Sequence, residues 1–150
     1  RLRRLRDMGY PQIRDFESLV AYYANLWQNG HALQAWHFFR NNLRRQPDHV
    51  VMLNNAAWCL ATASHPLALP EEAVRFARRA LELAPAPHPQ LLDTLAATLA
   101  ANGQFEEAQQ VAQQAVDLAR QTGDVAAAAQ IQQRLAIYQQ HMPWREPPAP

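Results

Sequence analysis

The chain has 150 residues, with 14 basic and 13 acidic side chains and a formal net charge of +1. This length suits a single domain with a sizeable core, and 49% hydrophobic against 18% charged residues excludes an intrinsically disordered chain. One cysteine, Cys59, excludes a scaffold held by internal disulfides, and no apolar run approaches the ~20 residues that span a bilayer. Because the chain begins with Arg1 and shows no signal-peptide pattern, we expect it to be a piece of a longer protein.

Residues 1–12 form an N-terminal basic segment that begins RLRRLR. Residues 1–50 carry 8 Arg and 4 acids, a charge of +4, whereas residues 51–150 carry 6 Arg and 9 acids, a charge of −3. We expect this segment to be the end of an upstream element. A basic run of this kind also flanks membrane spans on their cytoplasmic side, so a membrane-anchored parent chain stays open as an alternative.

A helix–turn–helix unit then occurs three times, at about residues 15–48, 49–87 and 89–122. In each first helix the apolar side chains recur at i, i+3, i+4 and i+7, the period of one helix face. These segments read FESLVAYYANLWQNG, VVMLNNAAWCLATAS and PQLLDTLAATLAANG. Each second helix has a small or apolar residue every three to four positions, such as Ala35, Phe39 and Leu43, which predicts close helix packing.

Prolines and glycines mark where these helices begin and end. Pro47 and Pro85 end second helices, and Pro70 begins one with two acids behind it, where the helix dipole favours negative charge. Gly30 and Gly103 supply the tight turns inside the first and third units. The middle unit has the longer turn SHPLALPE instead.

A last helix is predicted at residues 124–140, after Gly123 and Asp124. Its apolar residues form a single stripe, which is what the terminal helix of a stacked array needs, so we interpret it as a cap. The folded part therefore covers residues 13–141. Residues 142–150 predict a loosely held Pro-rich tail.

A unit of about 34 residues with Gly at the turn, Ala and an aromatic in the second helix and Pro at its end resembles the tetratricopeptide repeat family. Gly103, Phe105, Ala108 and Ala115 fit this motif, although Leu19 and its equivalents replace an aromatic early in the first helix. The segments LNNAAWCLATAS, LLDTLAATLAANGQFEEA and the terminal Y-x-x-x-x-P-W-R-E resemble the C-terminal repeats of multidomain bacterial proteins of this family. The resemblance implies an all-α, right-handed α-solenoid of three units plus a C-terminal capping helix.

In that family the first helices line a concave groove that receives a partner. Carried over position by position, the resemblance implies a partner-binding groove made of Val20, Ala24, Trp27, Gln28, Val51, Asn54, Asn55, Trp58, Thr62, Gln90, Asp93 and Ala97.

Asn54 and Asn55 carry the sharpest hypothesis for this groove. An Asn amide offers an acceptor and two donors, so it can hold the backbone of an extended peptide, as asparagines do in similar repeat proteins. Trp27 and Trp58 are predicted to flank the groove as large rigid anchors. The alternative for all four is packing against neighbouring helices. For Cys59, beside Leu60 in an apolar helix, we expect a buried, inert thiol.

Catalytic, metal and cofactor sites have no sequence signal here. The six His include no pair at the i, i+4 spacing of a helical zinc site, and HExxH, CxxC and Gly-rich phosphate loops are lacking. Chaperone-binding members of the family hold a C-terminal carboxylate in a clamp of cationic and Asn side chains. Such a clamp is not expected here, because Asn55 is the only residue of this sequence that matches the clamp positions. The Arg clusters at 1–6 and 40–45 could neutralise phosphates, but the net charge of +1 argues against nucleic acid as the partner.

The sequence thus predicts a non-catalytic protein–protein interaction module, or scaffold, that binds a partner peptide or helix in the concave groove. The alternative is a structural module that packs on the rest of a larger bacterial protein or associates with itself. Composition does not decide between a cytoplasmic and a periplasmic compartment.

Overall fold

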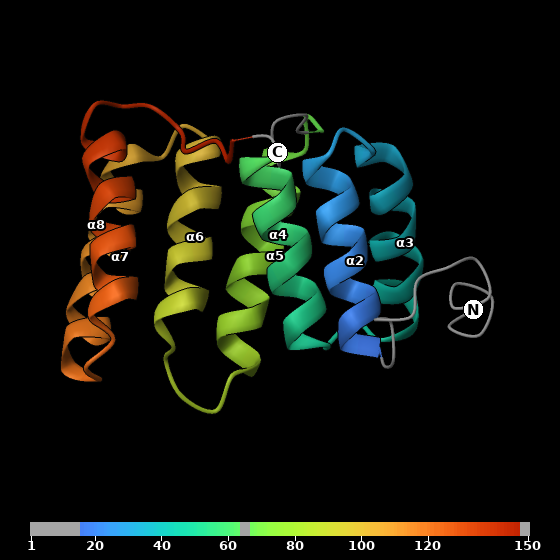
Figure 1. Ribbon diagram of the computed structural model, residues 1–150, viewed down its shortest axis with the longest axis horizontal. Helices are drawn as coiled ribbons and strands as arrows, with labels where there is room; N and C mark the ends of the chain where they lie inside the picture. The colour runs from blue at the N-terminus through green and yellow to red at the C-terminus, as the bar shows by residue number, and fades with distance from the viewer. Residues whose placement is uncertain (1–15, 64–66, 148–150) are drawn as a thin grey trace.

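The computed structural model describes residues 16–63 and 67–147, and within these ranges the chain is entirely helical, without a strand. The predicted all-α class is therefore confirmed. The basic segment at residues 1–12, part of the long middle turn and the last three residues lie outside the described ranges. Helix labels follow Figure 1, and the helices are α2 (Phe16–Gln28), α3 (Ala32–Arg45), α4 (Val50–Thr62), α5 (Pro70–Leu83), α6 (Pro89–Ala101), α7 (Phe105–Gln121) and α8 (Val125–Gln139).

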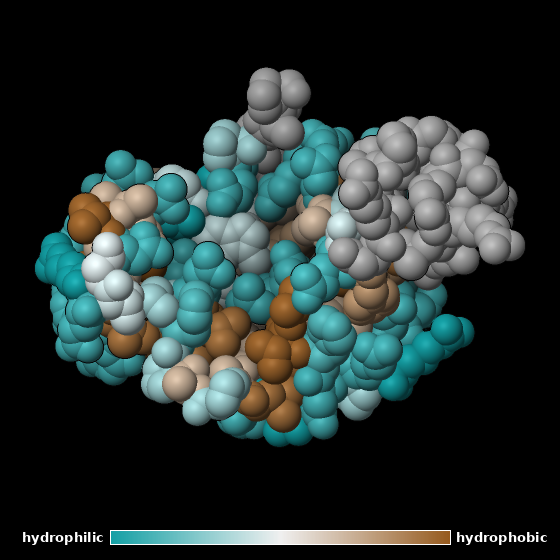
Figure 2. All heavy atoms as spheres, turned by 60° about the horizontal axis from the view of Figure 1, so that its bottom comes forward, coloured by the Kyte–Doolittle hydropathy of each residue, from teal (hydrophilic) through white to brown (hydrophobic). Residues whose placement is uncertain are grey.

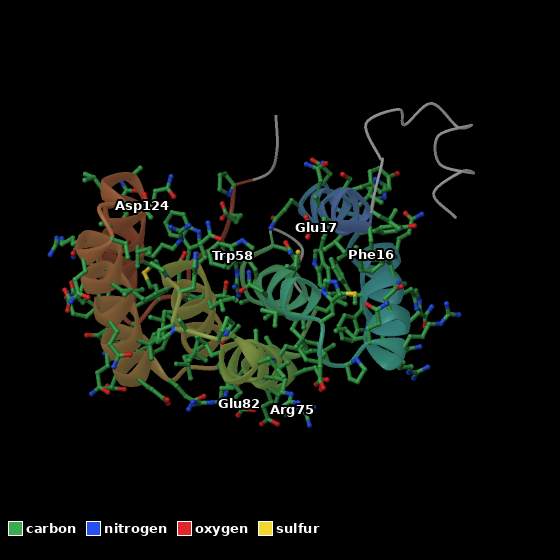
Figure 3. All side chains as sticks on the ribbon, turned by 90° about the horizontal axis from the view of Figure 1, so that it is seen from below. Phe16, Glu17, Trp58, Arg75, Glu82 and Asp124 are labelled. Atoms are coloured by element: carbon green, nitrogen blue, oxygen red, sulfur yellow. The ribbon has the colours of Figure 1, made fainter. Side chains whose placement is uncertain are left out.

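The helices lie in two rows, with α2, α4, α6 and α8 in one and α3, α5 and α7 in the other (Figure 1). Helices that follow each other in the chain pack together, and α4 also contacts α2 and α6 in its own row. Seen along the helices, the first row bends so that its free side is concave (Figure 3). The side chains that α2, α4, α6 and α8 present on this side therefore share one hollow.

Local sequence signals explain where the helices begin and turn. The His49 ring accepts a hydrogen bond from the backbone N–H of Met52 (3.2 Å), and the Asp124 carboxylate accepts one from that of Ala127 (3.0 Å). Each side chain thus satisfies a backbone donor that has no partner inside its helix. Gly103, between α6 and α7, has φ +77°, a left-handed conformation that only glycine adopts without strain.

Two clusters of buried residues form the core. The cluster around α2, α3 and α4 is rich in aromatics, whereas the one around α6, α7 and α8 is built on small residues such as Ala112, which is fully buried. Small side chains let helix backbones approach closely, so the expected Ala stripe of α7 has its packing role. In the described residues no helix combines the length and the apolar character needed to cross a membrane.

Trp27 corrects one expectation. Its side chain has no exposed surface and lies in the first core cluster, with ring centroids 6.1 Å from Phe39 and 6.2 Å from Trp36. Both of these ring neighbours belong to α3, and the Trp27 side chain is fully buried, so Trp27 fills the core and does not flank the groove.

Candidate binding groove

Two adjoining pockets lie on the concave side, and we call them together the groove. The first, about 390 Å³, is lined by Ala21, Ala24, Asn25, Gln28, Asn55, Trp58, Cys59, Glu146 and Pro147. The second, about 320 Å³, is lined by Asn54, Asn55, Trp58, Gln90, Asp93, Thr94, Ala127, Gln130, Ile131, Arg134 and Glu146. Figure 2 shows this side hollowed between the two ends of the molecule, with mostly hydrophilic residues around the hollow.

A stack of three side chains from distant parts of the chain stands at the centre of the groove. The Arg134 guanidinium of α8 lies 5.0 Å from the ring centroid of Trp58 on α4 and 5.5 Å from that of Trp144, which follows α8. A cation over an indole ring is attracted by the negative face of that ring, so both tryptophans hold this guanidinium. Figure 3 shows Trp58 in the middle of the concave side, where this stack forms.

Asp93 on α6 gives Arg134 a counter-charge. One carboxylate oxygen of Asp93 lies 3.5 Å from a guanidinium nitrogen of Arg134, and both side chains are largely buried. Burial raises the pKa of Asp93 to about 6, although the positive charge of Arg134 opposes this rise and the negative charge of Glu146 adds to it. The pair therefore carries a carboxyl group that changes its charge in mildly acidic solution.

The segment Met142–Pro147 lies across the groove without regular secondary structure. The Arg145 guanidinium donates a hydrogen bond to the carbonyl of Ala61, and the backbone N–H of Glu146 donates one to the carbonyl of Thr62 (2.7 Å). The prediction of a loosely held tail is wrong for residues 142–147, because two consecutive residues of this segment are hydrogen-bonded to the C-terminal end of α4. Residues 148–150 of the predicted tail lie outside the described ranges.

The two asparagines differ in how their amides are used. The side-chain amide of Asn55 donates to the carbonyl of Val51 in the same helix (2.8 Å). Asn54 lines the second pocket, and its side-chain oxygen is buried and has no hydrogen-bond partner among the described residues. The amide of Asn54 thus has an oxygen without a hydrogen bond, whereas the amide of Asn55 already donates one within its own helix.

The structure brings seven of the predicted groove residues to the two pockets: Ala24, Gln28, Asn54, Asn55, Trp58, Gln90 and Asp93. Among the other five, Val20, Trp27, Thr62 and Ala97 are buried, and Val51 is exposed without lining either pocket. Thr62 takes part differently, because its backbone carbonyl, not its side chain, accepts the bond from the tail. Cys59, at 1% exposure, is buried as expected, and burial raises the pKa of its thiol.

Sequence reasoning did not find Arg134, Trp144, Arg145 or Glu146. The signal of the capping helix is its apolar stripe, and a single Arg on the polar side of that helix adds nothing to it. The terminal P-W-R-E was noted as part of a resemblance, but nothing local in it indicates contact with α4, which lies 84 residues earlier in the chain.

Comparison of this chain with protein-family models, with curated proteins and with solved structures finds no match. The resemblance to the tetratricopeptide repeat family therefore rests on the sequence motifs. Within the part of the chain that the structure describes, no group of three or more His, Cys, Asp or Glu side chains is placed to hold a metal ion.

Proposed function

We propose that this chain is a protein–protein interaction module whose concave groove holds an extended segment of a partner protein. The proposal treats the helix pairs α2/α3, α4/α5 and α6/α7 with the cap α8 as a short right-handed α-solenoid of the tetratricopeptide type. It assigns no catalytic step to the groove, and the partner is a protein rather than a nucleic acid.

The unsatisfied acceptor of Asn54 supports the proposal most directly. A buried amide oxygen without a partner costs about 1–3 kcal/mol, so this atom of a pocket-lining side chain gains from a ligand that supplies a donor. The backbone N–H of an extended peptide is a donor of the right kind, because its carbonyls and N–H groups all need partners outside the segment itself. The ring of Trp58 beside it offers a large apolar surface for a side chain of the same peptide.

Selection of peptides from a random phage-displayed library against the immobilised chain tests this function. We expect enriched peptides whose affinity falls at least tenfold in Asn54→Ala and in Trp58→Ala, because each change removes one of the two groove contacts. Asn41→Ala is the matched control, since Asn41 is an exposed asparagine on α3, in the other row of helices.

Two outcomes would contradict the proposal. One is a library from which no peptide is enriched, which would favour the alternative that the module packs on the rest of its parent chain. The other is enriched peptides that bind Asn54→Ala and Trp58→Ala as tightly as they bind Asn41→Ala, which would move the binding surface away from the groove. Circular dichroism of each variant shows that it keeps its helices.

A further inference from the structure

We propose that the groove is specific for an extended segment that carries an aromatic residue followed directly by arginine, and that the chain's own segment Met142–Pro147 competes with such a partner for it. This inference rests on the proposed function and adds the chemistry of the ligand. It is argued from three features of the way in which the tail occupies the groove.

The first feature is the end of α4. The carbonyls of Ala61 and Thr62 belong to the last turn of this helix, where carbonyl groups have no partner within the helix and the helix dipole is negative. The tail satisfies both, one with the guanidinium of Arg145 and one with the backbone N–H of Glu146. An arginine at this place therefore gains a charge-assisted bond, and the neighbouring N–H fixes the register of an extended backbone.

The second feature is the stack on Arg134. The Arg134 guanidinium contacts two rings, one from Trp58 on α4 and one from Trp144 in the tail. Trp58 and Arg134 belong to the helices, so they are present whichever segment fills the groove. A ligand needs only an aromatic ring to complete the stack, and in the tail this ring comes immediately before the arginine that reaches α4.

The third feature is that the tail and a partner would need the same space. Glu146 lines both pockets, and Pro147 lines the first. Asn54, whose side-chain oxygen has no hydrogen-bond partner among the described residues, lines the second pocket together with Glu146. These pockets are the space that the tail leaves open. A partner with an aromatic residue followed by arginine needs the carbonyls of Ala61 and Thr62 and the guanidinium of Arg134, which the tail already contacts. Such a partner therefore has to displace the tail, whose attachment to α8 gives it a high effective concentration.

Unsatisfied donors on both partners of the stack are consistent with a contact that can be exchanged. The indole nitrogen of Trp144 and the Nε of Arg134 are buried without a hydrogen-bond partner among the described residues. A tail fixed as a permanent part of the core would be expected to leave fewer such atoms. A ligand that displaces the tail and supplies an acceptor for the Nε of Arg134 would bind better than the tail does.

The test uses the full chain with its tail released from the groove by the double substitution Trp144→Ala and Arg145→Ala. The probe is a fluorescently labelled peptide with the sequence of residues 141–147, HMPWREP, and its anisotropy is followed up to about 1 mM, the range of effective concentrations for short tethers. We expect the released variant to bind the peptide at least tenfold more tightly than the wild-type chain, in which the groove is occupied.

Two controls test whether the peptide binds in the groove. A peptide in which Trp and Arg are both replaced by Ala is expected to lose binding to the released variant. Trp58→Ala added to the released variant is expected to weaken the unaltered peptide at least tenfold. Equal binding of the peptide to the wild-type chain and the released variant would overturn the inference, and so would no binding to either.

The library selection separates this inference from the proposed function. Repeated on the released variant, it is expected to enrich peptides with an aromatic residue followed by arginine. Enriched peptides that lack this pair but depend on Asn54 and Trp58 would support the proposed function and overturn the inference. Binding of HMPWREP without enrichment of any library peptide would overturn the proposed function, while the tail's own contact would stand.

Discussion

Asp93 and Arg134 form the one ion pair in the described residues whose two side chains are both largely buried, with exposed fractions of 11% and 13%. Asp93 comes from α6 and Arg134 from α8, and the guanidinium of this pair also lies over the rings of Trp58 and Trp144. Burial weakens the pair as a source of stability, because both ions give up their hydration. It also makes the site sensitive to the protonation of the acid.

The first prediction concerns the pH dependence of stability. The pKa of Asp93 is about 6 in the folded chain, against 3.8 for an unperturbed carboxyl. The folded state therefore binds the proton more tightly than the unfolded state, so this group adds stability as the pH falls from about 6 to about 4. At 1.36 kcal/mol per pKa unit the change amounts to about 3 kcal/mol, as an order of magnitude.

Urea unfolding of the wild-type chain and of Asp93→Asn at pH 4, 5, 6 and 7 measures this effect. As the pH is lowered, we expect the unfolding free energy of the wild type to increase relative to that of Asp93→Asn. Asp117→Asn, at an exposed position on α7, is the control for the loss of a surface aspartate. A difference between wild type and Asp93→Asn that stays constant over this pH range would contradict the prediction.

The second prediction tests the close approach of α7 to its neighbours. Ala112 is fully buried in the second core cluster, so a larger side chain there has to push helices apart. Ala112→Leu is expected to lower the unfolding free energy by about 1–3 kcal/mol, the usual cost of overpacking. Gln114→Leu places the same leucine side chain on the exposed side of α7 and is expected to change stability by less than about 0.5 kcal/mol. Chemical denaturation gives both values, and equal effects would mean that α7 has room to move.

The third prediction isolates the backbone conformation at the turn between α6 and α7. A methyl group on Gly103 would meet no atom within 4 Å, so sterics with neighbours play no part and only its φ of +77° matters. Gly103→Ala is expected to cost about 1 kcal/mol, because L-residues other than Asn and Asp resist the left-handed region. Gly103→Asn should cost less. Thermal unfolding of both variants checks this order, and an Ala variant as stable as the wild type would show that the turn relaxes.

The fourth prediction concerns the thiol of Cys59. Its burial and its raised pKa keep the concentration of the reactive thiolate low in the folded chain. We expect a disulfide reagent such as dithionitrobenzoate to label the native protein only at the rate of its unfolding. A Cys59→Ala chain with cysteine placed at the exposed position of Gln114 gives the reference rate for an accessible thiol. Labelling of Cys59 at that reference rate would contradict the burial.

Much of the helical architecture follows from local pattern. The apolar period of each segment is a property of neighbouring residues, and so are the breaks at Pro47 and Gly103, which explains why the all-α class could be predicted. The face that a residue presents is harder to derive. Trp27 was assigned to the groove by alignment, yet its large side chain fills the space between α2 and α3, because an indole buries more apolar area there than on the surface.

The chemistry at the centre of the groove depends on contacts that no local pattern encodes. Asn55 could be placed on the concave side, but its bond to Val51 depends on a rotamer that the sequence does not specify. Arg134 gains its role only when α8 lies beside α6, and Trp144 only when the chain turns back after α8. Contacts between residues so distant in the chain require the full arrangement of helices.

The bond from Glu146 to Thr62 has a consequence for how the molecule opens. In a linear array each helix pair touches only its neighbours, so the two ends can fray independently of the middle. Here the chain returns from its last helix to the second pair, and fraying of α8 therefore has to break contacts at α4 as well. The segment closes part of the chain into a loop, in which α8 and α4 gain or lose their order together.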